Sequence, residues 1–309
     1  MLHGWIILDK PIGLGSTTAV SAVKRILRQA GEPKTKVGHG GTLDPLASGV
    51  LPIALGEATK LCGRTLDANK AYDFTIRFGE ETDTLDAEGS VIARSDARPT
   101  ADQIDVVLPQ FTGEIEQMPP AFSALKIGGK PAYALARLGK KPEMKARSVS
   151  IHSLRVFASQ REVSHLTRRR EVAEELGSVT LSAEVSKGTY IRSLARDIAH
   201  ALGTVGHVSY LRRTRAGPFS LDQAISLDFL KEAAKARALT RTVLPLTAAL
   251  DDIPALPVNS RQADMLRHGQ RLAGFPAQPG LCMAMLGGTP VALVEAEADG
   301  LKVVRGFNL

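Results

Sequence analysis

The sequence predicts an α+β protein, in which a large part with a mixed β-sheet and helices precedes a small β-rich part. Segments that alternate like strands are interleaved with segments of helical spacing, without the regularity of βαβ units. The chain has 309 residues, more than one domain usually holds. Three prolines in residues 244–258 mark a candidate linker. We therefore expect one domain over residues 1–248 and a second over residues 249–309.

The spacing of apolar residues predicts the N-terminal elements. The apolar runs at residues 5–8 and 50–55 are typical of buried strands. Between them, Ser16 or Thr17 is a candidate N-cap of a helix and Gly31 is its candidate stop. The apolar residues of this predicted helix are Val20, Val23, Leu27 and Ala30.

Later elements are predicted in the same way. Residues 72–78 and 179–185 alternate apolar and polar side chains, as half-buried strands do. A helix follows from about residue 191 and is ended by Gly203. Beyond the candidate linker we expect a short helix at 261–268 and strands at 291–296 and 301–305.

The positive charge of the chain is concentrated in one segment. The formal net charge is +7, and residues 126–155 hold eight basic residues against one acidic residue. A solvated face usually mixes both signs, so this segment predicts a surface that contacts a polyanion. Residues 161–176, by contrast, hold basic and acidic residues together and predict a solvated insertion.

Several classes of protein are excluded. No apolar run approaches the roughly 20 residues that span a bilayer, and the first residues do not have the pattern of a secretory signal. The two cysteines, Cys62 and Cys282, lie far apart, which argues against a disulfide framework and against a zinc site. We expect a cytoplasmic protein that has no contact with a membrane.

An acidic run at residues 80–89 invites comparison with a metal site. Its spacing lacks the alternating oxygen ligands and the glutamate at the twelfth position of an EF-hand loop. We expect instead a loop that borders the binding site. No glycine-rich dinucleotide fingerprint follows a strand, so we expect neither a metal nor a nucleotide cofactor.

The most informative segment is residues 37–49, with the sequence VGHGGTLDPLASG. Its glycines permit backbone geometry that other residues resist, and Pro45 directs Asp44 toward an extended conformation. An isolated Asp-Pro pair is most often a turn between two elements. A functional role for the Asp44 carboxylate is therefore inferred only in combination with motifs elsewhere in the chain.

Seven short motifs occur in a fixed order between His3 and Arg215. They are LDKP at 8–11, GHGGTLDPLA at 38–47, GEATK at 56–60, KAY at 70–72, SALK at 123–126, SKGTYIR at 186–192 and HVSYLRR at 207–213. In this order they resemble the motifs of TruB-type tRNA pseudouridine synthases.

The resemblance implies a fold and an activity. The fold would be a mixed-sheet pseudouridine synthase domain with an RNA-clasping insertion at about residues 117–150 and a PUA-like C-terminal module. The activity would be isomerisation of the uridine at position 55, in the T-arm of tRNA, by base flipping and without a cofactor. The reaction breaks the N1–C1′ bond and rejoins the ring through C5. The resemblance further implies a monomer whose partner is tRNA.

It also implies catalytic residues. Asp44 matches the family nucleophile, and attack at the sugar C1′ or at the base C6 both remain open. Tyr72 matches a tyrosine that stacks on the flipped base and is a candidate for proton abstraction; the alternative is a core aromatic residue at the head of a strand. Arg192 matches the arginine that pairs with the catalytic aspartate, and the alternative is a surface ion pair.

Four further residues match substrate-binding positions. His39 matches a histidine that helps to extract the target base, and Tyr190 and Leu211 match positions around the uracil. Lys60 matches a family lysine whose role is phosphate binding or structural. At position 40 the family usually carries Thr or Ala, so Gly40 predicts either a looser loop or an altered contact with RNA.

A different class of function competes with catalysis. An RNA-binding protein that folds tRNA without chemistry would also need the basic segment. Only an enzyme needs Asp44, Tyr72 and Arg192 together, so the arrangement of these three side chains separates the two hypotheses.

Overall fold

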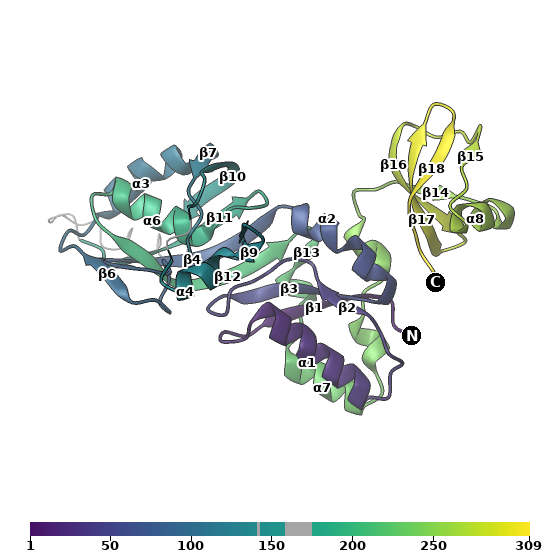
Figure 1. The fold of residues 1–309 in the computed structure, drawn as a ribbon, viewed down its shortest axis with the longest axis horizontal. Helices are drawn as coiled ribbons and strands as arrows, with labels where there is room; N and C mark the ends of the chain where they lie inside the picture. The colour runs from purple at the N-terminus through teal and green to yellow at the C-terminus, as the bar shows by residue number, and fades with distance from the viewer. Residues whose placement is uncertain (141–142, 158–174) are drawn as a thin grey trace, which may run out of the picture.

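The computed structural model describes residues 1–140, 143–157 and 175–309. Residues 158–174 lie outside this part, so the predicted solvated insertion at 161–176 falls almost wholly outside the described residues. In the described part no helix is long and apolar enough to cross a bilayer. The α+β prediction is confirmed (Figure 1).

The larger part of the molecule is built on a nine-stranded sheet. Along its main path the order is β1-β3-β12-β4-β11-β10-β7, with β2 beside β3 and β13 beside β12. Among the described strands of this sheet only the β3–β12 pair is parallel, so the sheet is mixed as predicted. Its strands are β1 (Gly4–Lys10), β2 (Val37–His39), β3 (Ser48–Leu55), β4 (Lys70–Phe78), β7 (Gly113–Gln117), β10 (Arg147–Val156), β11 (Ser178–Val185), β12 (Gly206–Ala216) and β13 (Phe219–Ser220).

Alternation along the strands gives this sheet two apolar faces. In β1, Ile6 and Leu8 belong to one buried cluster, whereas Trp5 and Ile7 belong to another. The first cluster also contains apolar residues of α1 (Ser16–Gln29), α3 (Ala101–Val107), α6 (Ile191–Ala201) and α7 (Leu227–Lys235). The second lies under the helical segments η1 (Gly56–Leu61) and η5 (Leu246–Ala249).

The C-terminal part is a separate five-stranded sheet with its own core. The order is β14-β16-β17-β18-β15, and α8 (Ser260–Arg267) packs against it. Its strands are β14 (Ala255–Pro257), β15 (Leu272–Ala273), β16 (Gly280–Leu286), β17 (Thr289–Glu297) and β18 (Gly300–Gly306). The predicted helix and the two predicted strands of this part are all present.

The candidate linker at 244–258 is not a bare connector. Leu244 exchanges two backbone hydrogen bonds with Trp5, and the Trp5 indole donates to the Leu246 carbonyl at 3.2 Å. Leu246 and Leu250 are buried in the cluster that also holds Met283 and Phe307 of the C-terminal part. The two sheets therefore meet across an apolar seam.

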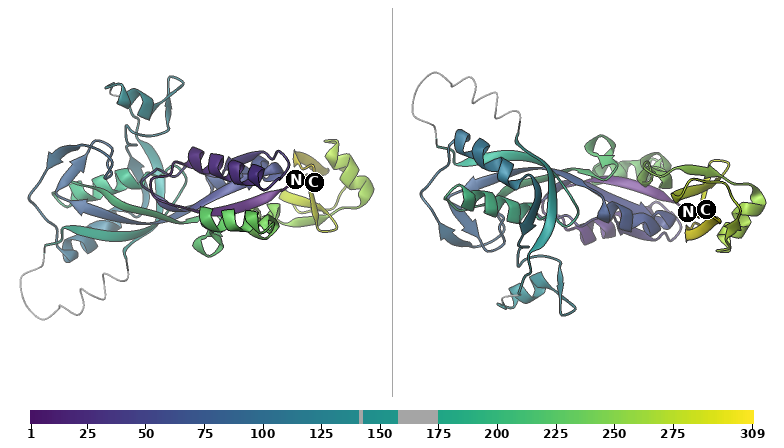
Figure 2. Two further views of the ribbon diagram at one scale, coloured as in Figure 1. Left: turned by 90° about the horizontal axis from the view of Figure 1, so that it is seen from below. Right: turned by 90° about the horizontal axis from the view of Figure 1, so that it is seen from above.

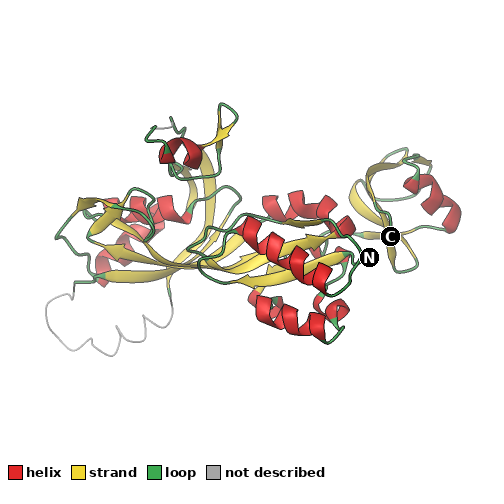
Figure 3. Cartoon of the chain, turned by 60° about the horizontal axis from the view of Figure 1, so that its bottom comes forward, coloured by secondary structure: helices red, strands yellow, loops and turns green. Residues whose placement is uncertain are grey.

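The basic insertion, residues 117–150, leaves the sheet between β7 and β10. It contains the short hairpin β8 (Lys126–Ile127) and β9 (Lys130–Pro131), followed by α4 (Ala132–Arg137). It projects away from the sheet, as Figures 2 and 3 show. The remaining elements are α2 (Cys62–Asp67), β5 (Glu80–Thr82), β6 (Val91–Arg94), η2 (Leu108–Phe111), η3 (Leu221–Gln223) and η4 (Leu239–Thr242).

Candidate functional site

The loop that carries Asp44 is held by three polar side chains from other segments. The Ser16 hydroxyl donates to the Leu43 carbonyl and accepts from the Leu43 amide, both at 2.8 Å. The buried Arg213 guanidinium donates to the carbonyls of Gly41, Thr42 and Val50. The Lys10 ammonium reaches the Pro45 carbonyl at 3.3 Å. The loop is thus fixed on both sides of the aspartate.

These contacts correct the predicted start of the first helix. Gly15, in an extended conformation, is the N-cap, and Ser16 is the first helical residue. Because the Ser16 hydroxyl is bonded to Leu43, it is not available to cap its own helix. The predicted stop is present, since Gly31 has a φ of 79° and its amide bonds back to the Arg28 carbonyl.

Asp44 and Arg192 form a direct ion pair. Arg192 Nη2 lies 2.9 Å from Asp44 Oδ2. The Arg192 side chain is 7% exposed and that of Asp44 is 37% exposed, so a buried guanidinium holds a carboxylate that remains open to solvent. Arg192 is itself fixed, because it donates to the Thr84 carbonyl at 2.8 Å and to the Phe122 carbonyl at 3.0 Å. A charged, fixed and accessible carboxylate is what a nucleophile requires.

A second carboxylate shares this arginine. Asp86 Oδ2 lies 3.4 Å from Arg192 Nη1 and is buried. Asp86 is held by the Thr84 hydroxyl and the Glu88 amide in a tight turn where Leu85 adopts a φ of 62°. The acidic run at 80–89 therefore borders the Asp44 site, while its first two acids, Glu80 and Glu81, pair with Arg94 and His200 outside the run.

The charges of the site change the proton affinity of two neighbours. Burial lowers the pKa of Lys10 to about 8, although the Asp44 carboxylate acts in the opposite direction. Partial desolvation raises the pKa of Glu88, and the carboxylates of Asp86 and Asp44 raise it further. The site thus combines several carboxylates with the buried guanidiniums of Arg192 and Arg213 and the buried amine of Lys10.

Tyr72 and Leu211 come from adjacent strands of the sheet. In the β4–β12 pairing, Arg213 lies opposite Tyr72 and Leu211 lies opposite Phe74, so these residues share one face. On this face Arg213 reaches the carbonyls of the Asp44 loop. Leu211 is buried in the cluster that holds Leu43, and Tyr72 is half-buried against it. The register therefore brings Tyr72 toward the loop.

Tyr190 joins the site to the basic insertion. It is the N-cap of α6, two residues before Arg192. Its backbone amide and carbonyl both bond to the buried Gln117 side chain, at 2.7 and 3.1 Å. The Arg147 guanidinium lies 4.8 Å from the centroid of its ring, a cation–π distance. Gln117 and Arg147 both lie in the insertion, Gln117 at its start and Arg147 near its end.

The loop before Asp44 is tight at position 40. Gly40 is buried and its amide donates to the Pro52 carbonyl at 2.8 Å, so the expectation of a loose loop is wrong. A Cβ atom at this position would lie 2.0 Å from Thr65 Oγ1. His39, at the end of β2, accepts from the Gly41 amide at 3.4 Å. Burial, with a smaller effect from Arg213, lowers the pKa of His39.

The Lys60 side chain is engaged in contacts within the protein. Its ammonium donates to the Gly306 carbonyl at 2.8 Å and pairs with Glu57 at 2.6 Å. Glu57 in turn accepts from the Asn308 amide. Lys60 therefore links η1 to the end of the C-terminal part, which supports the structural alternative for this residue over contact with phosphate.

The sequence predicts no role for Asp86 or Arg213, and for Ser16 it predicts only a helix cap. Arg213 and Lys10 belong to two of the seven motifs, but a motif does not reveal which carbonyls of a distant loop its side chains will bond. Asp86 lay in an acidic run with no local sign that one carboxylate was buried. Only pairing across the sheet and the turn at Leu85 bring these groups to Asp44.

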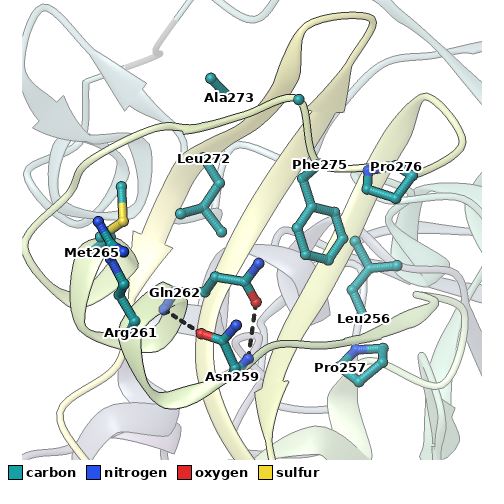
Figure 4. Close-up of a pocket in the computed structure, with 11 residues that line it drawn as sticks. Leu256, Pro257, Asn259, Arg261, Gln262, Met265, Leu272, Ala273, Phe275 and Pro276 are labelled. Carbon is teal, nitrogen blue, oxygen red and sulfur yellow. Dashed lines mark hydrogen bonds between the residues drawn. The ribbon is translucent and has the colours of Figure 1, made fainter.

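The C-terminal part has a separate hollow of about 570 Å³ between β14, α8 and the segment after β15 (Figure 4). Its lining is mostly apolar, with Leu256, Met265, Leu272 and Phe275, and with Asn259 and Gln262 joined by the capping hydrogen bonds of α8. Among the described residues, no group of three or more His, Cys, Asp or Glu side chains is arranged to hold a metal ion.

Two family descriptions match this chain. The TruB family pseudouridylate synthase N-terminal domain matches residues 24–191, and the tRNA pseudouridylate synthase B C-terminal domain matches residues 192–251. Together they span the Asp44 loop, both strands that carry Tyr72 and Leu211, and Arg192.

Whole proteins are similar over their full length. Proteins named tRNA pseudouridine synthase B from Zymomonas mobilis and Novosphingobium aromaticivorans are each 57% identical to this chain. The alignments cover 99% of this chain and 96% of the first protein, and 100% of this chain and 98% of the second. The protein of that name from Caulobacter vibrioides is 47% identical, with 100% and 97% covered.

Solved structures share the fold. One is described as an H/ACA RNP bound to a substrate RNA containing 2′-deoxyuridine, with a TM-score of 0.71, 26% identity and coverage of 99% of this chain and 86% of that one. Another, a Cbf5-Nop10-Gar1 complex, gives a TM-score of 0.68, 29% identity and coverage of 99% and 84%.

Proposed function

Because the chain belongs to the TruB family of pseudouridine synthases, we propose that it converts the uridine at position 55, in the T-arm of tRNA, to pseudouridine, with Asp44 as nucleophile and without a cofactor. The enzyme is an isomerase that acts on uridine in tRNA. The target position, the role of Asp44 and the independence from a cofactor are the proposed parts.

The Asp44–Arg192 ion pair is the observation that carries the proposal. An ordinary aspartate side chain is already ionised near pH 7, so its arginine partner serves to orient it and to offset its partial burial. Asp44 attacks C1′ or C6 of the bound nucleotide, and the N1–C1′ bond breaks. The detached uracil turns, C5 bonds to C1′ and the bond to Asp44 breaks, and C5 then loses its proton while N1 gains one. Atoms and charge balance with no added reagent.

The flipped base needs a surface to rest on. Tyr72 supplies a half-buried ring on the face where the Asp44 loop is anchored, and Leu211 supplies an apolar wall. Stacking is worth about 1–3 kcal/mol per base, comparable with the few kcal/mol that extraction of a nucleotide costs. We propose His39 and Tyr190 as further contacts of the nucleotide.

The basic insertion is suited to hold the T-arm. Its cations Lys126, Lys130, Arg137, Lys140 and Lys145 are exposed, and so is the ring of Tyr133. Through Arg147 and Gln117 the insertion also contacts Tyr190, close to Arg192. Binding of RNA there would order the site as well as supply affinity. The C-terminal sheet is proposed as a PUA-like RNA-binding module.

The variant Asp44→Asn tests the nucleophile. An amide has nearly the same shape as a carboxylate but does not form the covalent bond, so formation of pseudouridine should be lost while tRNA still binds. The assay is tritium release from C5-labelled uridine in tRNA, with purified protein and no added cofactor. Asp228→Asn, the same change on the exposed face of α7, is the matched control and should keep full activity.

Two results would contradict the proposal. Turnover by Asp44→Asn at the wild-type rate would remove Asp44 as the nucleophile. Undiminished tritium release from a tRNA in which cytidine replaces uridine 55 would move the target away from the T-arm.

A further inference from the structure

A second basic surface lies outside the Asp44 site and outside the basic insertion. It is a hollow of about 1140 Å³ between the second half of α1 and residues 32–37, which lead into β2. We call it the α1 groove. Leu27 and Val37 are buried at its base. Its charged lining residues are Lys24, Arg25, Arg28, Glu32, Lys34 and Lys36.

The charge of the α1 groove is strongly one-sided. Five of these six side chains are cationic, and all five cations are exposed. Among the described residues, none of the five lies within 4.0 Å of a carboxylate in an ion pair. By contrast, Lys231 and Lys235 of α7 are each paired with an acid one turn away. A cation near a helix C-terminus is favoured by the helix dipole, but this accounts for Arg28 and not for Lys34 or Lys36.

The groove is connected to the Asp44 loop at both of its walls. The first residue of α1, Ser16, is bonded to Leu43, and Arg28 follows twelve residues later, which is about 18 Å along the helix axis. On the other wall, Val37 begins the strand that ends at His39. In both views of Figure 2, α1 and the basic insertion lie on the same side of the long axis, and α7 lies on the opposite side.

We propose that the α1 groove binds the phosphate backbone of the substrate RNA, at a distance from the target uridine. This inference rests on the proposed function, in which the substrate is tRNA. The length of about 18 Å along α1, from Ser16 beside the Asp44 loop to Arg28 in the groove, corresponds to about five phosphate intervals along one strand of a duplex, at roughly 3.4 Å each. A folded RNA is long enough to reach the groove and the Asp44 site together, whereas a single nucleotide is not.

RNA fits the groove better than an anionic membrane does. A lipid surface is met by a protruding face with apolar or aromatic side chains that insert. The α1 groove is a hollow, and the apolar side chains at its base are buried. A ridge of phosphates with flexible lysine and arginine side chains around it matches this shape and charge.

The test compares two double variants with the same change of charge. Lys24→Gln/Lys34→Gln removes two cations from the groove, and Lys231→Gln/Lys235→Gln removes two from the adjacent helix α7, where each lysine is paired with an acid. We measure the Kd for full-length tRNA over a salt series, together with kcat and KM. Each lost phosphate contact lowers the slope of log Kd against log salt by about 0.7 to 0.9, so the groove variant should lose about 1.4 to 1.8.

At low salt the groove variant should bind tRNA at least about fivefold more weakly, with KM raised and kcat unchanged, since this contact is equal in the ground and transition states. The α7 variant should match the wild type in slope, Kd and KM. A groove variant whose slope equals that of the wild type would overturn the inference. So would an unchanged RNA slope combined with loss of binding to vesicles of phosphatidylserine and phosphatidylcholine.

The two proposals fail in different ways. Wild-type protein that forms no pseudouridine in tRNA would contradict the proposed function. Wild-type protein that forms it, together with equal slopes for the wild type and the groove variant, would remove the α1 groove from the interface and leave the proposed function intact.

Discussion

Replacement of Gly40 by Ala should destabilise the protein, because Thr65 already fills the space beside it. A Cβ at position 40 would lie 2.0 Å from Thr65 Oγ1 and 2.9 Å from Thr65 Cβ. Thr65 is 1% exposed, and its hydroxyl donates to the Cys62 carbonyl at 3.0 Å. Overpacking of this kind typically costs about 1–3 kcal/mol, and turning the hydroxyl away would lose a hydrogen bond worth about 1 kcal/mol. We expect Gly40→Ala to lose about 2 kcal/mol of unfolding free energy.

A double-mutant cycle isolates this contact. Thr65→Ala alone should cost about 1–2 kcal/mol, because it removes a buried methyl group and a hydrogen bond. In Gly40→Ala/Thr65→Ala the new methyl group occupies the vacated space, so the double variant should be about 1–2 kcal/mol more stable than the sum of the single effects. Urea unfolding followed by far-UV circular dichroism measures each value.

Gly63→Ala is the matched control. It is the same substitution in the neighbouring helix α2, and an added Cβ there meets nothing within 4 Å. It should be neutral or should stabilise by about 0.5–1 kcal/mol. Because position 40 lies between His39 and Asp44, Gly40→Ala should also lower kcat by about ten- to a hundredfold, and the double variant should recover part of it. A stable Gly40→Ala, or strictly additive effects, would refute the reasoning.

Two further predictions concern the charges around Asp44. Asp86→Asn removes the second carboxylate from Arg192, so kcat should fall at least about tenfold with little change in KM, whereas Asp83→Asn in the same turn should be nearly silent. Equal activity of the two variants in the tritium assay would show that Asp86 does not position Arg192. Between about pH 8 and 10.5, Lys10 should contribute a rise of up to about 3 kcal/mol in the free energy of unfolding, because folded Lys10 loses its proton at its lowered pKa while the unfolded chain keeps it up to the ordinary value; Lys70, whose pKa burial also lowers to about 8, acts in the same direction. Denaturant unfolding at several pH values measures this rise; Lys10→Met should lack that contribution, and an identical profile in the variant would contradict the lowered pKa.

The regular elements could be predicted from the sequence because their signals are local. Residues 72–78 alternate and form β4, whose Phe74, Ile76 and Phe78 are buried as expected. Gly31 and Gly203 end their helices with positive φ angles. The first helix began one residue differently, because Ser16 bonds to a loop 27 residues away. A cap is a local signal, and a tertiary hydrogen bond overrides it.

The site was predictable in part, for the same reason. Asp44 and Arg192 were assigned from motifs and lie in contact. Asp86 and Arg213 were not, since their roles depend on a turn and on strand register rather than on neighbours in the chain. The α1 groove was not predicted, although residues 24–36 hold five basic residues against one acidic residue, because the sequence does not show that Lys24 and Lys34 line one hollow.

The position of Trp5 has a practical consequence. It is the only tryptophan of the chain, it is fully buried, and its ring centroid lies 5.3 Å from that of Phe219. The same cluster holds Met283, Leu293 and Phe307 of the C-terminal sheet. Intrinsic fluorescence of this protein is therefore a single-site optical reporter of how the two sheets are docked. Separation of the C-terminal sheet would expose the Trp5 indole to water and shift its fluorescence emission, while the loop that carries Asp44 stayed intact.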